Sequence, residues 1–428
     1  MKHNKREAKR TKVSDSVGVA IAIAPSVLML SLSSGGAFAD GPVGPPSEGA
    51  ILQDKAAEDW TPERMERAVP PPLRRPMPTE VPEGAAPSAA EEEEEEQGNP
   101  GYAPGWEPSS DEPQPDPDTF YEISPGDPLS FAPKADGVAR HGSPPSKPTD
   151  FARYAPFQRW TWFGDYLMYP ISTVGKLFFR QNGQDRVCTA AVIQRNTIAT
   201  AGHCIHDGSG SDSGGSSNIV FCPSFNEAGP NPNLGCWPAV TWKTSEHWYK
   251  NGNLDRDYAC VVLAPGGTVI PDSVGNVTGW LGRAWNWPAR QAVFQWGYPA
   301  APPFAGNRII TTVSTEWYEV DMIPGDGQKS KYIGSDQTGG SSGGPWWLSM
   351  THPDSTQEVP DTDGSIITDP TGLTPWINGV VSHSRCQGEC TAATEFTQEL
   401  GSPPFLSTDD DINESEDVFQ ACFIAGGA

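Results

Sequence analysis

Short apolar runs separated by Gly, Pro, Asn and Asp characterise the chain from about residue 151 onward. The clearest of these runs are 174–179, 188–193, 196–201, 258–263, 292–296 and 377–382. Each has the length of a β-strand, whereas long helical periodicity is scarce. Many short strands between turn residues predict an all-β barrel or sandwich fold for residues 151–428.

Residues 40–150 lack this pattern. They are rich in Pro, Gly and Ser, contain the acidic run Glu91 to Glu96, and carry 24 acidic and 8 basic side chains. Such a segment buries too little apolar area to offset the loss of chain entropy on folding. We therefore expect a disordered acidic segment. It is either a solvated spacer or a pro-segment that is removed on maturation, and the sequence leaves both interpretations open.

The first 39 residues have the pattern of an export signal. Six Lys and Arg residues lie within the first twelve positions, an apolar stretch spans residues 17–32, and Ala37-Phe38-Ala39 is typical of a cleavage site. An uncleaved membrane anchor is the alternative, although the stretch is short and contains Pro25. We expect a secreted, extracellular protein that makes no membrane contact after signal cleavage.

The charge balance narrows the choice of partners. The chain has a formal net charge of -25, and residues 151–428 still carry 28 acidic and 15 basic side chains. Nucleic-acid and anionic-lipid binding need a basic surface. We therefore expect no nucleic-acid partner and no binding to anionic lipid.

The first chemical motif is Thr200-Ala201-Gly202-His203-Cys204. A catalytic His must be held rigidly within hydrogen-bond reach of its nucleophile, and a neighbouring Cys could fix such a loop. One alternative is a His beside a structural disulfide with no catalytic role. The other is a metal site from Cys188, His203, Cys204 and His206, but an oxidising compartment disfavours thiolate ligands, so we expect no metal.

The second motif is the run Gly-Gly-Ser-Ser-Gly-Gly-Pro at residues 339–345. Glycines allow a sharp turn that directs successive backbone amides at one point. Ser342 would be the nucleophile, with the amides of Gly340 and Ser342 as an oxyanion hole. Ser341 is the candidate in a shifted frame, and a Gly/Ser run alone often marks only a loop.

The third motif is Asp257, directly before the apolar strand 258–263. A carboxylate there can be buried and directed at an imidazole, which fixes the imidazole tautomer. Asp255 is a neighbouring alternative, and an isolated Asp before a strand is usually only a turn residue.

Together the motifs run in the order His203, then Asp257 54 residues later, then Ser342 85 residues after that. Over about residues 170–400 the chain resembles the chymotrypsin/trypsin clan of serine peptidases. The segments 174–179, 221–223 and 257–259 are similar to those of bacterial glutamyl endopeptidases.

This resemblance implies two six-stranded antiparallel β-barrels with the active site in the cleft between them. His203 and Asp257 would come from the first barrel and Ser342 from the second. The implied function is a secreted serine endopeptidase, a hydrolase that forms an acyl-enzyme on Ser342 and needs no cofactor. We expect it to act on proteins or peptides as a monomer.

The sequence departs from the family at the positions linked to activation and specificity. Ser341 stands where trypsin-like zymogens have the Asp that pairs with a new N-terminus, so activation of a zymogen would follow another route. Asp336 occupies the position at which trypsins bind Arg or Lys. Ser382 and His383 lie on the segment that resembles the pocket-lining strand, where we expect substrate contacts. For His383 the alternative is a polar residue on the rim of the pocket. Glutamyl-specific members use a His on this strand at the place of Val381, so the preference between basic and acidic side chains stays open.

The resemblance implies a Cys188–Cys204 disulfide. Locality suggests Cys222–Cys236 and a tight Cys386–Cys390 loop, which leaves Cys260–Cys422. Eight cysteines allow 105 connectivities, so these last three pairings are open.

Three other functions remain for comparison. A catalytically silent peptidase-fold binding or adhesion module would lack a member of the triad. A lipase or esterase would place its His after its Ser, the reverse of the order found here. A cell-surface structural role for the acidic segment is compatible with an active peptidase.

Overall fold

The computed structural model describes thirteen stretches of the chain. They are residues 41–45, 56–71, 100–108, 114–115, 120–122, 157–287, 292–320, 328–348, 358–360, 366–368, 375–385, 399–407 and 414–427. Among these residues, no helix combines the length and the apolar character needed to cross a membrane.

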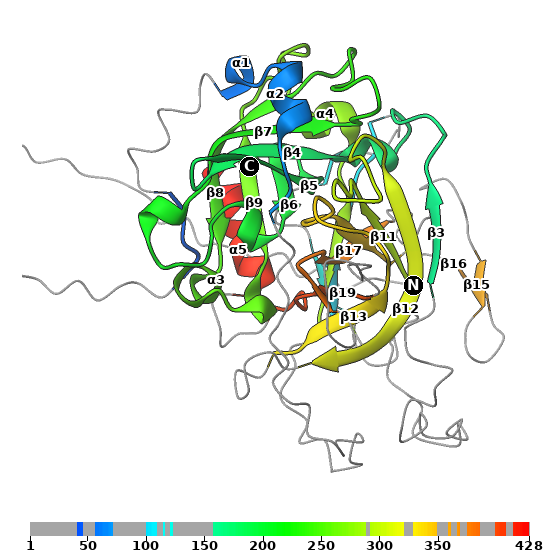
Figure 1. The fold of residues 1–428 in the computed structure, drawn as a ribbon. Coiled ribbons are helices and arrows are strands. Elements are labelled where there is room, and N and C mark those ends of the chain that lie inside the picture. The colour runs from blue at the N-terminus through cyan, green and yellow to red at the C-terminus, as the bar shows by residue number, and fades with distance from the viewer. Residues whose placement is uncertain are drawn as a thin grey trace, which may run out of the picture. The chain divides into compact units, whose positions relative to one another are not determined.

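The first part of the fold is a closed antiparallel barrel. Its strands are β4 (Val174–Gln181), β5 (Gln184–Gln194), β6 (Thr197–Thr200), β9 (Ala259–Leu263), β8 (Trp237–Thr244) and β7 (Ser217–Pro223), in that order around the barrel (Figure 1). Asn182 and Gly183, with φ of 50° and 75°, form the two-residue turn between β4 and β5. The apolar runs seen in the sequence fill the barrel with fully buried side chains such as Leu177, Val192 and Phe221.

The second part is an extended sheet. Its strands are β18 (His383–Arg385), β19 (Glu399–Ser402), β13 (Ser330–Gly334), β12 (Ile310–Val320), β11 (Ala292–Gly297), β14 (Pro345–Trp347), β17 (Trp376–Val380), β10 (Gly282–Trp285), β1 (Gly101–Ala103) and β2 (Tyr121–Glu122), in hydrogen-bonded order. Strand β3 (Phe157–Thr161) pairs with β12, which makes eleven strands. Strands β15 (Glu358–Pro360) and β16 (Ile366–Thr368) form a separate hairpin.

The predicted all-β class is confirmed, and the first of the two predicted six-stranded barrels closes as expected. The second half differs in its strand count: its strands form an extended sheet of eleven, three of which come from residues before 162. These additions join through backbone hydrogen bonds, which any side-chain sequence can make at an unpaired strand edge.

Few α-helices accompany the strands in the described part of the chain. They are α1 (Ala56–Asp59), α2 (Pro62–Arg67), α3 (Glu246–Asn251), α4 (Val274–Thr278) and α5 (Ser415–Ala425). Helix α5 contacts β8 and β9 and is joined to the barrel by the Cys260–Cys422 disulfide. The disulfides Cys188–Cys204 and Cys222–Cys236 are also present, so three of the four suggested pairings are found. The fourth, Cys386–Cys390, lies outside the described residues.

Residues 56–71, here called the N-terminal strap, lie on the barrel although they belong to the stretch 40–150 that we expected to be disordered. Trp60 is only 4% exposed and donates from Nε1 to the carbonyl of Asn218 at 2.7 Å. Arg64 forms two hydrogen bonds to the carboxylate of Asp185, at 2.7 and 2.9 Å. Most of residues 72–150 lie outside the described part of the chain, so the expectation of disorder there stays a prediction.

Candidate active site

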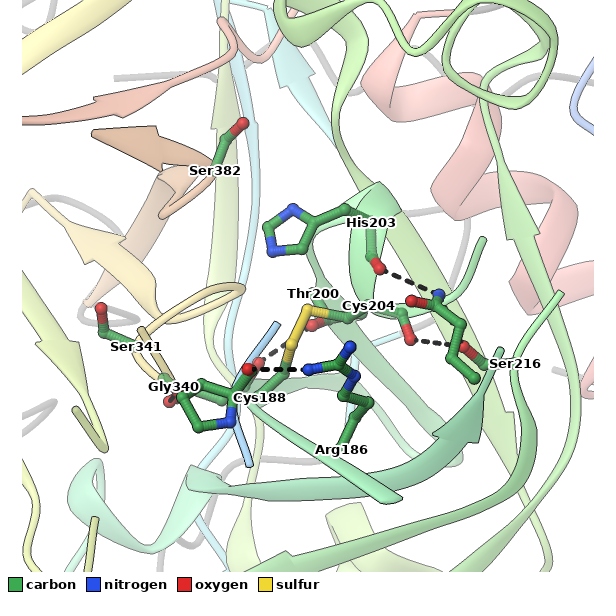
Figure 2. Close-up of a disulfide and its surroundings, with 12 residues drawn as sticks. Arg186, Cys188, Thr200, His203, Cys204, Ser216, Gly340, Ser341 and Ser382 are labelled. Atoms are coloured by element: carbon green, nitrogen blue, oxygen red, sulfur yellow. Dashed lines mark hydrogen bonds between the residues drawn. A yellow bond between two sulfur atoms is a disulfide. The ribbon is translucent and has the colours of Figure 1, made fainter. Parts of the chain in front are cut away.

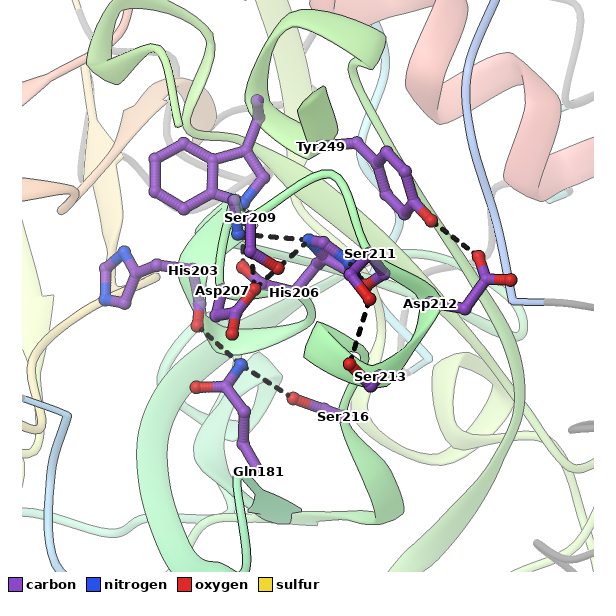
Figure 3. A network of polar contacts seen from close by, with 12 residues as sticks. Gln181, His203, His206, Asp207, Ser209, Ser211, Asp212, Ser213, Ser216 and Tyr249 are labelled. Atoms are coloured by element: carbon purple, nitrogen blue, oxygen red, sulfur yellow. Dashed lines mark hydrogen bonds and ion pairs between the residues drawn. The ribbon is translucent and has the colours of Figure 1, made fainter. Parts of the chain in front are cut away.

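The loop that carries His203 follows β6 and contains a short 3-10 helix, Gly202–Cys204. Gln181 donates from Nε2 to the carbonyl of His203 and to Ser216 Oγ, each at 3.1 Å (Figure 3). Ser216 in turn donates to the carbonyl of Cys204 at 2.9 Å. These bonds satisfy carbonyls that end the short helix, and they fix the backbone on both sides of the imidazole.

Gly202 allows this loop to approach its neighbours closely. A Cβ atom at this position would lie 2.7 Å from the indole of Trp248 and 2.9 Å from Asp257 Oδ1. No side chain fits in that space, so the Gly in the Thr-Ala-Gly-His-Cys motif has a steric cause.

Asp257 is fully buried and contacts His203 twice. Its Oδ1 accepts from the His203 backbone amide at 2.7 Å, and its Oδ2 lies 2.8 Å from Nδ1. An ionised carboxylate only accepts hydrogen bonds, so Nδ1 carries the proton and the lone pair of the neutral ring is on Nε2. This is the tautomer that a general base needs.

The alternative acid, Asp255, faces another part of the chain. Its Oδ1 accepts from the amide of Ser330 at 2.9 Å and from Ser330 Oγ at 2.6 Å. Asp255 thus links the loop before β9 to strand β13, whereas Asp257 is the carboxylate in contact with the imidazole.

The turn before β14 places Ser342 beside the barrel. The carbonyl of Ser342 accepts from the amide of Thr189 on β5 at 2.8 Å. Gly340 has φ of +100° and Gly343 has φ of +79°, conformations that favour glycine. Ser341 Oγ donates to the carbonyl of Thr338 at 2.7 Å, so its hydroxyl is turned away into the loop.

The two atoms between which a proton would move are both buried and without hydrogen-bond partners among the described residues. They are His203 Nε2 and Ser342 Oγ, which therefore form no hydrogen bond with each other in this structure. Catalytic hydrogen bonds are often long before a substrate binds, so the lack of this bond is compatible with catalysis.

The backbone amides of the turn divide into two groups. Those of Ser341, Gly343 and Gly344 donate to protein carbonyls. Those of Gly340 and Ser342 donate to no other group in the described part of the chain, so they can donate to a developing oxyanion.

The Cys188–Cys204 disulfide ties the His203 loop to β5, with an S–S length of 2.05 Å (Figure 2). The possible metal-binding atoms of Cys188, His203 and Cys204 all lie within 4.8 Å of one another. Sulfur atoms joined in a disulfide carry no thiolate charge, so the residues do not fit a zinc site of the type considered from the sequence.

Asp336 forms an ion pair with Arg159 of β3. Burial raises the pKa of this half-buried carboxyl, and Arg159 opposes that effect. The sequence singled out Asp336 as a ligand for a basic substrate side chain, but it gave no signal for Arg159, which lies 177 residues away. The guanidinium offsets the negative charge on which such selectivity would depend.

Ser382 and His383 are brought to Asp257 and not to an exposed pocket rim. Ser382 Oγ lies 2.5 Å from Asp257 Oδ2, and His383 Nδ1 lies 2.8 Å from Ser382 Oγ. Both side chains are fully buried. The expectation that the His383 side chain binds substrate stays a prediction, and in this structure its ring is enclosed and hydrogen-bonded to Ser382 and Tyr332.

The strap reaches the edge of this site. Val69 accepts from the amide of Val187 on β5 at 3.2 Å and donates to the carbonyl of Asp185 at 3.1 Å. A Cβ atom on Gly339 would lie 3.2 Å from the ring of Pro70, one residue before Gly340. Residues 69–71 thus lie between the strand that carries Cys188 and the turn that carries Ser342.

Comparisons with known proteins place the chain beside proteases. No family model matches the chain. Its sequence is 26% identical over 164 residues to a glutamyl endopeptidase of Bacillus licheniformis, covering 37% of this chain and 44% of the relative. It is 28% identical over 95 residues to an extracellular metalloprotease of Bacillus subtilis, covering 22% of this chain and 26% of the relative. The chain therefore spans less than half the length of these curated relatives.

Three similar solved structures are proteases. The thermostable serine protease AL20 from an extremophilic microorganism is 31% identical, with 55% of this chain and 91% of that chain covered and a TM-score of 0.42. Protease Anisep from Arthrobacter nicotinovorans is 24% identical, with 61% and 98% covered and a TM-score of 0.44. A Glu endopeptidase solved in complex with MPD is 15% identical, with 63% and 97% covered and a TM-score of 0.40.

Proposed function

Because the chain is a chymotrypsin-clan serine peptidase related to glutamyl endopeptidases, we propose that it is a secreted serine endopeptidase. In this proposal Ser342 is the nucleophile, His203 is the general base and Asp257 orients the imidazole. The observation that carries it is the double contact of the buried Asp257 carboxylate with His203, at 2.7 and 2.8 Å.

The reaction is acyl transfer in two halves. Ser342 Oγ attacks the carbonyl carbon of the scissile peptide while His203 Nε2 takes the hydroxyl proton. The amides of Gly340 and Ser342 bind the oxyanion of the tetrahedral intermediate. His203 then gives its proton to the leaving amine, and a water molecule hydrolyses the acyl-enzyme by the same steps. No step needs a metal or an organic cofactor.

Asp257 contributes charge as well as orientation. When His203 takes the proton it becomes an imidazolium, and a buried carboxylate 2.8 Å from Nδ1 stabilises that cation in a medium of low dielectric. The second bond, to the backbone amide of His203, prevents the carboxylate from rotating away from the ring.

We also propose that the chain is made as a precursor in which the strap limits access to the site. Val69 pairs with the β5 backbone at positions 185–187, and Pro70 and Pro71 lie against Gly339. A substrate that extends past the Cys188–Cys204 disulfide toward this edge would meet the strap. Removal of residues 1–39 on export and later release of the strap would give the mature peptidase.

A library of mixed peptides tests the proposed activity. Purified protein freed of the strap should cut peptides internally, and Ser342→Ala should abolish every cut. Ser341→Ala is the matched control: its hydroxyl is bonded to Thr338, so the cuts should persist. No cuts from folded wild-type protein would favour the catalytically silent binding module instead.

A further inference from the structure

A chain of buried hydrogen bonds continues from Asp257 on the side away from His203. Ser382 Oγ lies 2.5 Å from Asp257 Oδ2, His383 Nδ1 lies 2.8 Å from Ser382 Oγ, and His383 Nε2 lies 2.8 Å from Tyr332 Oη. The side chains of these four residues are all fully buried. The chain therefore connects the second sheet, through β13 and β18, to the proposed triad.

The direction of each hydrogen bond follows from the chemistry of the groups. The Asp257 carboxylate can only accept, so the Ser382 hydroxyl must donate its one proton to Oδ2. Ser382 Oγ can then only accept from His383, which requires a proton on Nδ1. A neutral imidazole with its proton on Nδ1 has a lone pair on Nε2, and that lone pair accepts from the Tyr332 hydroxyl.

His383 is neutral in this setting. Burial lowers its pKa to about 4, an effect that the neighbouring Asp257 carboxylate opposes and His203 reinforces. A neutral imidazole has two tautomers, and the alternative one would carry its proton on Nε2. In that tautomer Nδ1 would be an acceptor, and the Ser382 hydroxyl could turn from Asp257 to His383.

The surroundings fix the ring in place. His383 pairs with Gly401 across β18 and β19, and a Cβ atom on Gly401 would lie 2.3 Å from Nε2 and 2.6 Å from Cδ2. The ring therefore lies flat on a glycine, and Tyr332 packs against it edge-on at a centroid separation of 5.2 Å. With the ring position fixed, the tautomer is the remaining variable.

We propose that Tyr332 and His383 are positioning residues that lock the His383 tautomer and thereby hold the Ser382 proton on Asp257. This inference rests on the proposed function of the triad. The donated hydrogen bond stabilises the carboxylate in the orientation that holds His203. The hydrogen bond between Tyr332 Oη and His383 Nε2 thus acts on Asp257, and through Asp257 on His203, by way of two further hydrogen bonds.

Two substitutions of His383 separate this role from simple packing. The side-chain NH2 of an Asn can occupy the place of Nδ1 and donate to Ser382, whereas a Gln reaches the place of Nε2 and leaves Ser382 without a donor. We expect His383→Asn to keep most of the activity and His383→Gln to lower kcat about tenfold at unchanged KM. Equal losses in the two variants would contradict the lock.

Tyr332→Phe tests the tautomer directly. It removes one hydroxyl without changing the ring, and we expect kcat to fall several-fold, about fivefold, with KM unchanged. The matched control is Tyr169→Phe, which removes another buried tyrosine hydroxyl. That hydroxyl lies outside the site and donates to the carbonyl of Trp280 at 3.1 Å. We expect the control to retain wild-type kcat.

Nitrogen-15 NMR of the imidazoles gives a readout that does not depend on activity. In wild-type protein at pH 7, His383 should have the proton on Nδ1, and in Tyr332→Phe the signal should shift toward the Nε2–H form. An Nε2–H form in wild-type protein would overturn the lock, even if the protein proves to be an active peptidase. Conversely, an inactive wild type with the Nδ1–H form would overturn the proposed function and leave the lock standing.

Discussion

Asp257 contacts His203 through both of its carboxylate oxygens, one at the backbone amide and one at Nδ1. The two bonds together fix the position of the residue and the tautomer of its ring. Because the loop also depends on Gly202 and on the Cys188–Cys204 disulfide, the imidazole is held from three directions.

Replacement of Asp257 by Asn should separate catalysis from folding. An amide can present its NH2 to Nδ1 and so favour the wrong tautomer, and we expect kcat to fall about 10⁴-fold. Steady-state kinetics on a cleaved peptide would measure this. Asp255→Asn is the matched control, because that carboxylate bonds Ser330 and not the imidazole. It should lower thermal stability while kcat per active site stays close to that of wild type.

The Arg159–Asp336 ion pair leads to a prediction about specificity. Arg159→Gln should leave the Asp336 carboxylate without its counter-charge, and kcat/KM for peptides with Arg or Lys before the cut should rise about tenfold. The measurement belongs at pH 8, because burial raises the pKa of Asp336. Arg308→Gln, which removes an exposed pair with Glu227, should change nothing. An unchanged preference in Arg159→Gln would show that Asp336 does not face the substrate.

His383 should make the fold sensitive to acid. Its pKa is about 4 in the folded protein and close to its ordinary 6.5 when unfolded, so between these values the unfolded chain binds a proton that the folded chain does not. The free energy of unfolding should therefore fall by roughly 3 kcal/mol from this residue as the pH drops from 6.5 to 4. Above pH 6.5 it contributes no pH dependence.

Urea unfolding at pH 7 and at pH 4.5 measures this contribution. His383→Asn should lose less stability over that interval than wild type. The exposed His247 provides the control, and His247→Asn should follow the wild-type curve. Parallel loss of stability in His383→Asn and wild type would contradict the assignment.

The strap should respond to the loss of its ion pair. Arg64→Ala removes two hydrogen bonds to Asp185 and a stacking contact 4.1 Å from the ring of Trp60. A partly exposed pair of this kind contributes about 1 kcal/mol, so we expect the uncleaved precursor to be about fivefold more active. Arg67→Ala, which loses only an exposed bond to the carbonyl of Glu63, should match wild type. A precursor that is fully active with the strap intact would rule out inhibition by it.

Local signals were sufficient to predict much of the barrel and the contact between His203 and Asp257. The apolar runs became β4, β5, β6 and β9, and His203 and Asp257, which were singled out by their motifs and spacing, lie 2.8 Å apart, whereas the role of Ser342 stays a prediction. Gly202 and Gly340 stand out in their sequence motifs, and the structure gives the cause: a Cβ atom at either position would collide with neighbouring atoms.

The parts that could not be predicted depend on long-range contacts. Strand β3 joins β12 through backbone bonds, which leave no pattern in the sequence. Trp60 lies in a proline-rich acidic stretch, yet its indole is buried on a barrel that begins more than a hundred residues later. Tyr332 gave no signal, because its role depends on a tautomer of a residue 51 positions away.

Covalent labelling with a fluorophosphonate tests the central claim most directly. On protein freed of the strap, mass spectrometry should place one phosphonyl group on the peptide that contains Ser342. The adduct should disappear in Ser342→Ala, persist in Ser341→Ala and form far more slowly in His203→Ala. An adduct on Ser341, or no adduct on folded wild-type protein, would contradict the assignment of Ser342 as the nucleophile.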